Sequence, residues 1–232
     1  MQAFDLSAVL KPEFAALIVA GIRMTFVVFA GSWLLAMALS VVLLTIRLTP
    51  STVAQRAIAG YVAYHRNVPT LVQLMLWYFG ISNLLPDPMQ EWLADNNGEG
   101  VFAIIALGLC QAAFFSEDLR SGLRAVPPGQ TEAARALGHS YVGSMRYVIL
   151  PQAIRNAIPA LVNHTVSLFK NSSLAMAIGV TELTHVIREV ESRSFRTFEI
   201  YAIGTVIYLT VSLLLMATGA MLARHYRLAA AR

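Results

Sequence analysis

The sequence predicts an all-α, polytopic membrane protein: one domain with five transmembrane helices and an N-terminus on the outer side. Of its 232 residues, 57% are hydrophobic and only 13% are charged, whereas an average soluble domain carries about a quarter charged residues. Such a chain requires an apolar solvent. Uncharged stretches of about 20 residues recur along it, which is the length that a bilayer-crossing helix needs. Its arginines gather in alternate loops, which predicts a defined orientation.

The five predicted spans are apolar runs that hold at most one charge in their interior. They cover about residues 22–47, 57–86, 100–118, 152–181 and 199–223. Before the first span, Lys11, Pro12 and Glu13 interrupt the apolar residues 8–22. We therefore expect that segment to lie on the membrane surface as an amphipathic lead-in.

The orientation follows from the positions of the arginines. The predicted inner side holds Arg47, Arg56, Arg120, Arg124, Arg135, Arg146, Arg155, Arg224, Arg227 and Arg232. The opposite side holds Asp87, Glu91, Asp95 and Glu99 and the mixed segment 182–199. Because cytoplasmic loops are enriched in Lys and Arg, the C-terminus is predicted to be cytoplasmic and the N-terminus outside.

The loop between the third and fourth spans, residues 124–151, is too long for a simple connection, since helix connections in bundles usually take 2–8 residues. Two prolines and Gly129 make a sharp entry, and Thr131 is a plausible N-cap for a helix that contains Glu132. Gly138 is predicted to end this helix and to allow a turn into a second one, about Tyr141 to Leu150. We interpret the loop as a docking knob, with a solvated amphipathic loop as the alternative.

The loop sequence resembles the EAA signature of permease subunits of bacterial ABC importers. The matching residues are Glu132, Ala133, Ala134, Gly138, Leu150 and Pro151. In that family the loop inserts into a groove on an ATPase subunit. Two further segments, "HRNVPTLVQLMLWYFG" and "LFKNSSLAMAIGVTEL", are similar to the second and fourth spans of the polar amino-acid uptake subfamily, and in detail to glutamate/aspartate importer permeases.

This resemblance implies a multi-pass location in the bacterial cytoplasmic (inner) membrane and several partners. They are a cytoplasmic ATPase dimer, a second permease subunit, an extracytoplasmic substrate-binding protein and an amino-acid substrate. ATP and Mg²⁺ would act on the ATPase subunits, and this chain would carry no cofactor. Its two lysines, Lys11 and Lys170, follow Leu10 and Phe169, so neither completes the Gly-Lys pair of a phosphate-binding loop.

Two other classes of function are weaker. A secondary transporter or channel predicts an internal repeat, which the sequence does not show, and an intramembrane enzyme needs a nucleophile–base or metal constellation. The five histidines are scattered, without ligand spacing. We therefore expect a transport subunit without catalytic residues and without a metal site.

Polar residues inside the second span are the first candidates for substrate binding, because an ionisable group in a membrane is costly. Arg66 lies about 15 Å along the helix from Arg56, near mid-bilayer. Pro69 is expected to break or kink the helix there, next to Arg66, Asn67 and Gln73. A guanidinium can hold a carboxylate with two parallel hydrogen bonds; the alternative is a structural pairing with a buried acid or with carbonyl groups.

The fourth span supplies the second group of candidates. His164, Ser167 and Asn171 share one helix face, flanked by Lys170 and Ser172. Hydrogen bonding between helices is the alternative for the serines and asparagine. Many members of the resembled family carry acids at His164 and Asn171, so this cavity loses negative charge and we expect an acidic substrate, glutamate or aspartate. Glu117 is expected to pair with Arg120 or Arg124 and, with Asp118, to brace the loop.

Overall fold

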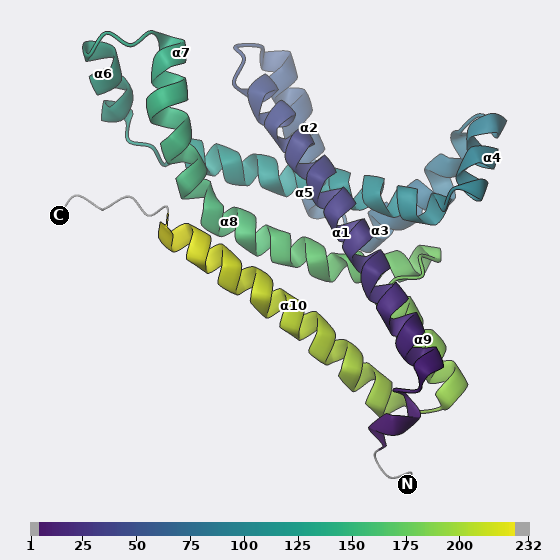
Figure 1. Cartoon of the computed structure of the whole chain (residues 1–232). Coiled ribbons are helices and arrows are strands. Elements are labelled where there is room, and N and C mark those ends of the chain that lie inside the picture. Colours follow the sequence, from purple (N-terminus) through teal and green to yellow (C-terminus); the bar gives the residue numbers. More distant parts are fainter. Residues whose placement is uncertain (1–4, 226–232) are drawn as a thin grey trace.

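The computed structural model describes residues 5–225, and every regular element in that range is helical (Figure 1). The helices are α1 (Pro12–Arg47), α2 (Thr52–Asn67), α3 (Thr70–Met75), α4 (Asp87–Asp95), α5 (Gly98–Arg124), α6 (Pro128–Ala136), α7 (Tyr141–Ser144), α8 (Leu150–Asn171), α9 (Leu183–Ser194) and α10 (Thr197–His225). Short 3₁₀ or π segments are η1 (Leu6–Ala8), η2 (Leu76–Ile81), η3 (Ser82–Leu84), η4 (Met145–Ile149) and η5 (Ser172–Ile178). The tail residues Arg227 and Arg232, used above for the orientation, lie outside the described residues.

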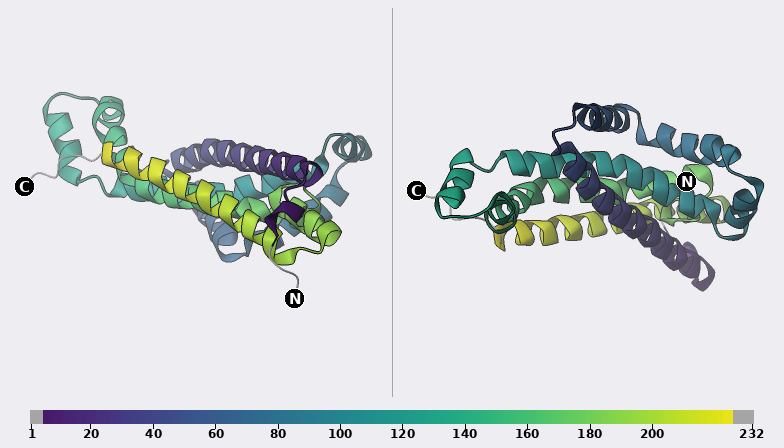
Figure 2. Two further views of the ribbon diagram at one scale, coloured as in Figure 1. Left: turned by 60° about the horizontal axis from the view of Figure 1, so that its bottom comes forward. Right: turned by 90° about the horizontal axis from the view of Figure 1, so that it is seen from above.

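Helix α5 is the centre of the bundle. Helices α1, α2, α3 and α8 pack around it, and α10 lies outside against α8 and α9 (Figure 1). Glycine allows one of these close approaches, because a Cβ added at Gly122 would lie 2.8 Å from the Ala157 Cβ on α8. Figure 2 shows α6 and α7 projecting at one end of the bundle, with α4 at the opposite end. The predicted knob is therefore a distinct feature of one end of the molecule.

Within residues 5–225, three helices are long and apolar enough to cross a membrane: α1, α5 and the Thr197–Arg224 part of α10. Helix α1 starts at Pro12 and continues without interruption to Arg47, so the separate surface lead-in over residues 8–22 was wrong. The reason is that Pro12 at the first helical position and Glu13 in the first turn are signals that start a helix. The sequence interpretation took them for an interruption.

The second predicted span is broken where Pro69 predicts a break. Helix α2 ends at Asn67, Val68 is extended with ψ of 132°, and α3 starts at Thr70 before passing into η2. The fourth span is also discontinuous, because α8 ends at Asn171 and the tighter η5 continues to Ile178. Irregular backbone of this kind is stable in a membrane only where protein or a watery cavity satisfies it.

A buried carboxylate organises the end of the bundle that faces away from the knob. Glu182 is fully buried and caps α9, accepting bonds from the backbone N–H groups of Thr184 and His185, each at 2.9 Å. The Tyr208 hydroxyl donates to the same carboxylate over 2.9 Å, and Thr25 Oγ1 accepts the Leu183 N–H at 3.0 Å. The Thr25 hydroxyl also lies 3.4 Å from Glu182 Oε2, so one acid joins α1, α9 and α10.

Removal of the Tyr208 hydroxyl is expected to destabilise this junction. In Tyr208→Phe the buried Glu182 loses a donor, which costs about 1–3 kcal/mol and lowers the melting temperature of the purified protein. Tyr201→Phe makes the same chemical change on the same helix at an exposed ring and should leave the melting temperature unchanged. Equal melting temperatures for the two variants, measured by a thermal-shift assay in detergent, would show that the network carries no stability.

Candidate functional site

The knob is built from α6, a left-handed turn at Gly138, and α7. The N–H of His139 donates to the Ala134 carbonyl at 3.1 Å, and that of Gly138 to the Arg135 carbonyl at 3.0 Å. This is a Schellman motif with Gly138 at its left-handed position, φ +85°. The predicted role of Gly138 is confirmed in its geometry. The predicted N-cap at Thr131 was wrong, since α6 already starts at Pro128, a residue suited to the first helical turn.

The second half of the knob runs straight into the fourth span. Ser140 caps α7 by accepting the N–H of Gly143 at 3.1 Å, and the helix continues through η4 into α8. Leu150 and Pro151 therefore lie inside one continuous helical path. The amides of Gln152 and Gln130 join this path to α6 across 3.1 Å. The knob is thus continuous with α8 through the backbone and is tied to it by a side-chain hydrogen bond.

The surface of the knob is unusually apolar for a segment that projects from the bundle. Leu137 is 83% exposed, and Tyr141 and Val142 are each 70% exposed. Glu132 and Ala133 are exposed as well, whereas Ala134 is buried against the knob's own interior. Contiguous exposed apolar residues mark interaction surfaces.

The break in the second span is closed from inside the chain. The Gln73 amide donates to the carbonyl oxygens of His65 at 3.1 Å and Val68 at 2.7 Å, and its Oε1 lies 2.5 Å from His65 Nδ1. Gln73 is 1% exposed. Its polar atoms satisfy the backbone groups that the break leaves free, so its observed role is to hold the break. Asn67 is exposed, and its amide donates to the Ala63 carbonyl on its own helix.

Two of the predicted site residues come together on the ring of Phe114. The Arg66 guanidinium carbon lies 5.5 Å from the ring centroid, and the imidazole of His164 lies 5.0 Å from it on centroids. His164 Nδ1 is 2.6 Å from Asp118 Oδ2. We call Arg66, Phe114, His164 and Asp118 the polar strip. It combines α2, α5 and α8, with the Arg66 side chain exposed at its edge.

The other predicted residues of the fourth span divide between two faces. Ser167 and Asn171 are half-buried on the His164 side of α8, whereas the Ser172 hydroxyl is fully buried and donates to the Phe169 carbonyl at 2.7 Å. Lys170 lines a groove between α8 and α10 with Tyr208 and Thr184. It therefore points to a different side of α8 from the polar strip.

The acids at the end of α5 have separate roles. Glu117 forms ion pairs with Arg47 of α1 and with Arg120, whose Nε lies 3.0 Å from Glu117 Oε2. This confirms the expected pairing with Arg120 and adds the connection to α1. Asp118 does not brace the loop, because its carboxylate contacts His164. Sequence reasoning also missed Phe114 and Glu182, which carry no local motif.

The described residues contain no group of three or more His, Cys, Asp or Glu side chains able to hold a metal ion. What the arrangement offers is a polar strip within a discontinuous helical bundle and an apolar knob mechanically continuous with it. Together with the long apolar helices, these features define a membrane-embedded helical protein.

Comparison with known proteins identifies the family. A family model described as "Binding-protein-dependent transport system inner membrane component" matches residues 18–228, and the chain belongs to this family. It is therefore a multi-pass inner-membrane protein, and the predicted resemblance to permeases of amino-acid ABC importers is confirmed.

Individual relatives carry different substrate names. The chain is similar to a nopaline transport system permease of Agrobacterium fabrum (34% identity; 78% of this chain and 76% of that protein) and to an arginine transport system permease of Bacillus subtilis (33%; 72% and 73%). It is also similar to a glutamate/aspartate import permease of Escherichia coli (28%; 90% and 86%). A crystal structure of an amino acid ABC transporter superposes with a TM-score of 0.84 at 29% identity, covering 97% of this chain and 100% of that one.

The role of Gln73 gives a prediction with an internal contrast. Gln73→Leu leaves two carbonyl groups without donors and should lower the stability by about 1–3 kcal/mol. Gln111→Leu makes the same change at a buried amide whose nitrogen has no hydrogen-bond partner among the described residues, so it should be neutral or stabilising. Thermal unfolding in detergent compares the two, and equal losses would contradict the assigned role of Gln73.

Proposed function

We propose that this chain is the translocation subunit of an ATP-driven importer of polar amino acids. In this proposal it crosses the membrane five times with its N-terminus outside and pairs with a second permease subunit, identical or homologous. An ATPase dimer, which carries ATP and Mg²⁺, grips the knob of each permease subunit. A binding protein delivers the substrate from the outer side. Closure of the ATPases moves the knob, and α8 carries the movement into the bundle as rigid-body alternating access.

The observation that carries this proposal is the knob: an exposed apolar surface on a segment that runs without a break into α8. Leu137 and Tyr141 expose an area that a solvated loop has no need to expose. The turn at Gly138 fixes the angle between the two arms of the knob. A channel or a secondary transporter requires neither feature.

We further propose that the substrate carboxylate binds at Arg66. Its guanidinium is exposed at the edge of the polar strip, and no ion pair to it occurs in the described part of the chain. The Asp118 carboxylate is engaged by His164, and the Arg66 guanidinium has no carboxylate partner in the described residues. A guanidinium without a carboxylate partner favours glutamate or aspartate over a cationic amino acid.

Asn67, Ser167 and Asn171 would add polar contacts. Gln73 and Ser172 would hold the backbone that carries the site through their bonds to carbonyl groups. Lys170 would attract the anionic substrate from the groove between α8 and α10.

Replacement of Gly138 tests the coupling. Gly138→Leu forces a branched side chain into a left-handed conformation, which costs about 1–2 kcal/mol and turns α6 away from its docking angle. Membrane insertion should remain normal, whereas copurification of the ATPase should be lost. Gly129→Leu places the same side chain on α6 without a positive φ and with open space around it, and should retain the ATPase. Retention by both variants would contradict the docking role.

Replacement of Arg66 tests the substrate site. Arg66→Lys keeps the charge but loses bidentate binding of a carboxylate, so glutamate uptake should require at least about tenfold more substrate. Arg188→Lys, at an exposed position on α9, should leave uptake unchanged. Uptake is measured with radiolabelled glutamate in cells that express the complete importer, with unlabelled arginine and glutamate as competitors. Competition by arginine alone would replace the acidic substrate by a cationic one.

The need for a partner is tested by reconstitution. Liposomes that contain the purified chain without any ATPase should not concentrate glutamate. Liposomes with the copurified ATPase, binding protein and internal ATP should do so. Accumulation by the chain alone would identify it as a secondary transporter.

A further inference from the structure

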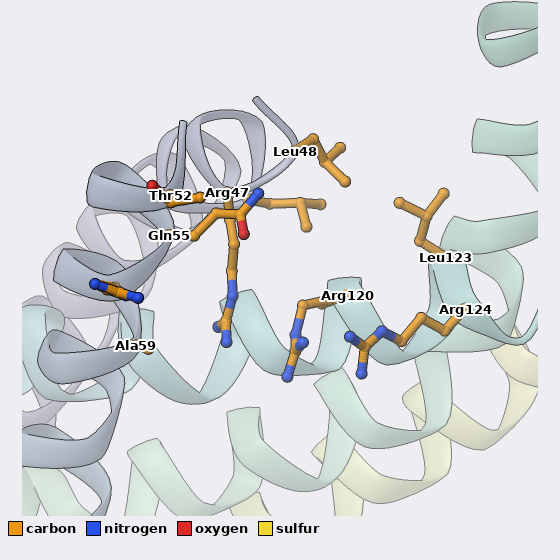
Figure 3. A pocket seen from close by; sticks show the side chains of 10 residues that line it. Arg47, Leu48, Thr52, Gln55, Ala59, Arg120, Leu123 and Arg124 are labelled. Carbon is orange, nitrogen blue, oxygen red and sulfur yellow. The ribbon is translucent and has the colours of Figure 1, made fainter. Parts of the chain in front are cut away.

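A second basic feature lies at the knob end of the bundle, away from the polar strip. It is a cavity of about 480 Å³ between the α1–α2 turn and the end of α5. Arg47, Arg56, Arg120 and Arg124 line it. Figure 3 shows the guanidinium groups of Arg47, Arg120 and Arg124 gathered along one side of α5. Nothing in the proposed transport cycle uses these four side chains together.

The charges of this cavity are not balanced within the described chain. Glu117 is the carboxylate that pairs with Arg47 and Arg120, and no ion pair is formed there by Arg56 or Arg124. Four positive charges therefore meet one negative charge. Arg120 and Arg124 are also four residues apart on one helix, where like charges repel. A bound anion would relieve this repulsion.

The walls of the cavity indicate what kind of anion fits. Leu44, Leu48 and Leu123 form its apolar part, while the Thr52 hydroxyl and the Gln55 amide add polar groups. Arg47 and Arg124 are the last residues of two membrane-crossing helices, α1 and α5. The cavity thus lies at the boundary where hydrocarbon meets headgroups, with apolar and cationic walls side by side.

The chain's own acids do not supply this anion. Of its carboxylates, Glu117, Asp118 and Glu132 belong to the knob end. The first is already paired in the cavity, the second is held by His164, and the third projects on the knob. In the described residues, Glu132 is thus the exposed side-chain carboxylate that a second copy would offer at this end, and it lies on the proposed docking surface of the knob. An anionic phospholipid offers a phosphodiester together with acyl chains.

We propose that this cavity binds the headgroup of an anionic phospholipid of the inner leaflet, with an acyl chain against its leucines. Basic pockets between helices on the cytoplasmic side are suited to such headgroups. The assignment to the inner leaflet depends on the orientation given under the proposed function. The bound lipid would tie the α1–α2 turn to α5, next to the start of the knob. Arg56 and Arg124 would contribute most, because Glu117 does not compete for them.

The test is lipid titration of the detergent-solubilised full chain followed by native mass spectrometry. Phosphatidylglycerol should bind to the parent protein, whereas phosphatidylcholine should not bind at the same concentration. R56Q/R124Q should weaken phosphatidylglycerol binding about 30-fold, because each arginine near an anionic lipid contributes about fivefold in affinity. R155Q/R224Q removes two arginines from a different groove, between α8 and α10, and should change the affinity by no more than about threefold.

Each outcome is decisive. Equal loss in the two double variants would show general attraction to a basic surface and would overturn the site, as would full binding by R56Q/R124Q. Inorganic phosphate that displaces the lipid at millimolar concentration would assign the cavity to a free phosphate instead. If R56Q/R124Q fails to fold, R56K/R124K should retain binding, and lipid binding to the parent must weaken between about 0.05 and 0.5 M NaCl. Salt-insensitive binding would overturn the proposal.

The outcome of the lipid-binding test does not depend on whether the chain imports amino acids. The lipid measurement requires neither uptake nor an ATPase, and R56Q/R124Q leaves Gly138 and Arg66 unchanged. Loss of lipid binding with normal copurification of the ATPase therefore supports the lipid site alone. Loss of copurification in Gly138→Leu with normal lipid binding concerns the coupling alone.

Discussion

The requirement that every backbone polar group be satisfied without water controls this structure. A bilayer interior offers no hydrogen-bond partners, so an unpaired carbonyl there must be met by the protein. Proline at position 69 cannot donate a backbone bond and interrupts the second span. The Gln73 amide donates to two of the carbonyl groups at the break, and its oxygen lies beside the His65 imidazole. This internal closure allows an irregular segment to lie beside the exposed guanidinium of Arg66 without unfolding the helix pair.

Polar side chains join neighbouring helices at each end of the bundle. At the end away from the knob one buried acid, Glu182, caps a helix and binds a hydroxyl of another. At the knob end Glu117 of α5 pairs with Arg47 of α1 and with Arg120 of its own helix. Between these ends apolar side chains form much of the packing, for example in the clusters that contain Leu107 and Phe115.

Charge is distributed so that the polar strip and the basic cavity remain separate. Within the strip, Asp118 and His164 satisfy each other through one hydrogen bond. Glu117, the neighbouring residue, points to the other side of α5 and leaves the cavity at the knob end strongly positive. Two adjacent acids therefore serve two different surfaces because successive residues on a helix are about 100° apart. Lys170 and Arg66 are both exposed and face different sides of α8, so the two cations do not belong to one surface.

The sequence by itself determined the features that depend on local covalent chemistry and on hydropathy. They are the membrane class, the break at Pro69, the left-handed turn at Gly138 and the helical knob. It misjudged the start of α1, because the same Pro12 and Glu13 that interrupt an apolar run also begin a helix. Only the tertiary structure decided which polar residues meet. The contact of His164 with Asp118 spans 46 residues, and Phe114 brings Arg66 and His164 onto one ring from three different helices. Periodicity assigns a residue to a face of its own helix, but the rotation of that helix against its neighbours is set by packing, so the partner across the interface is not encoded locally.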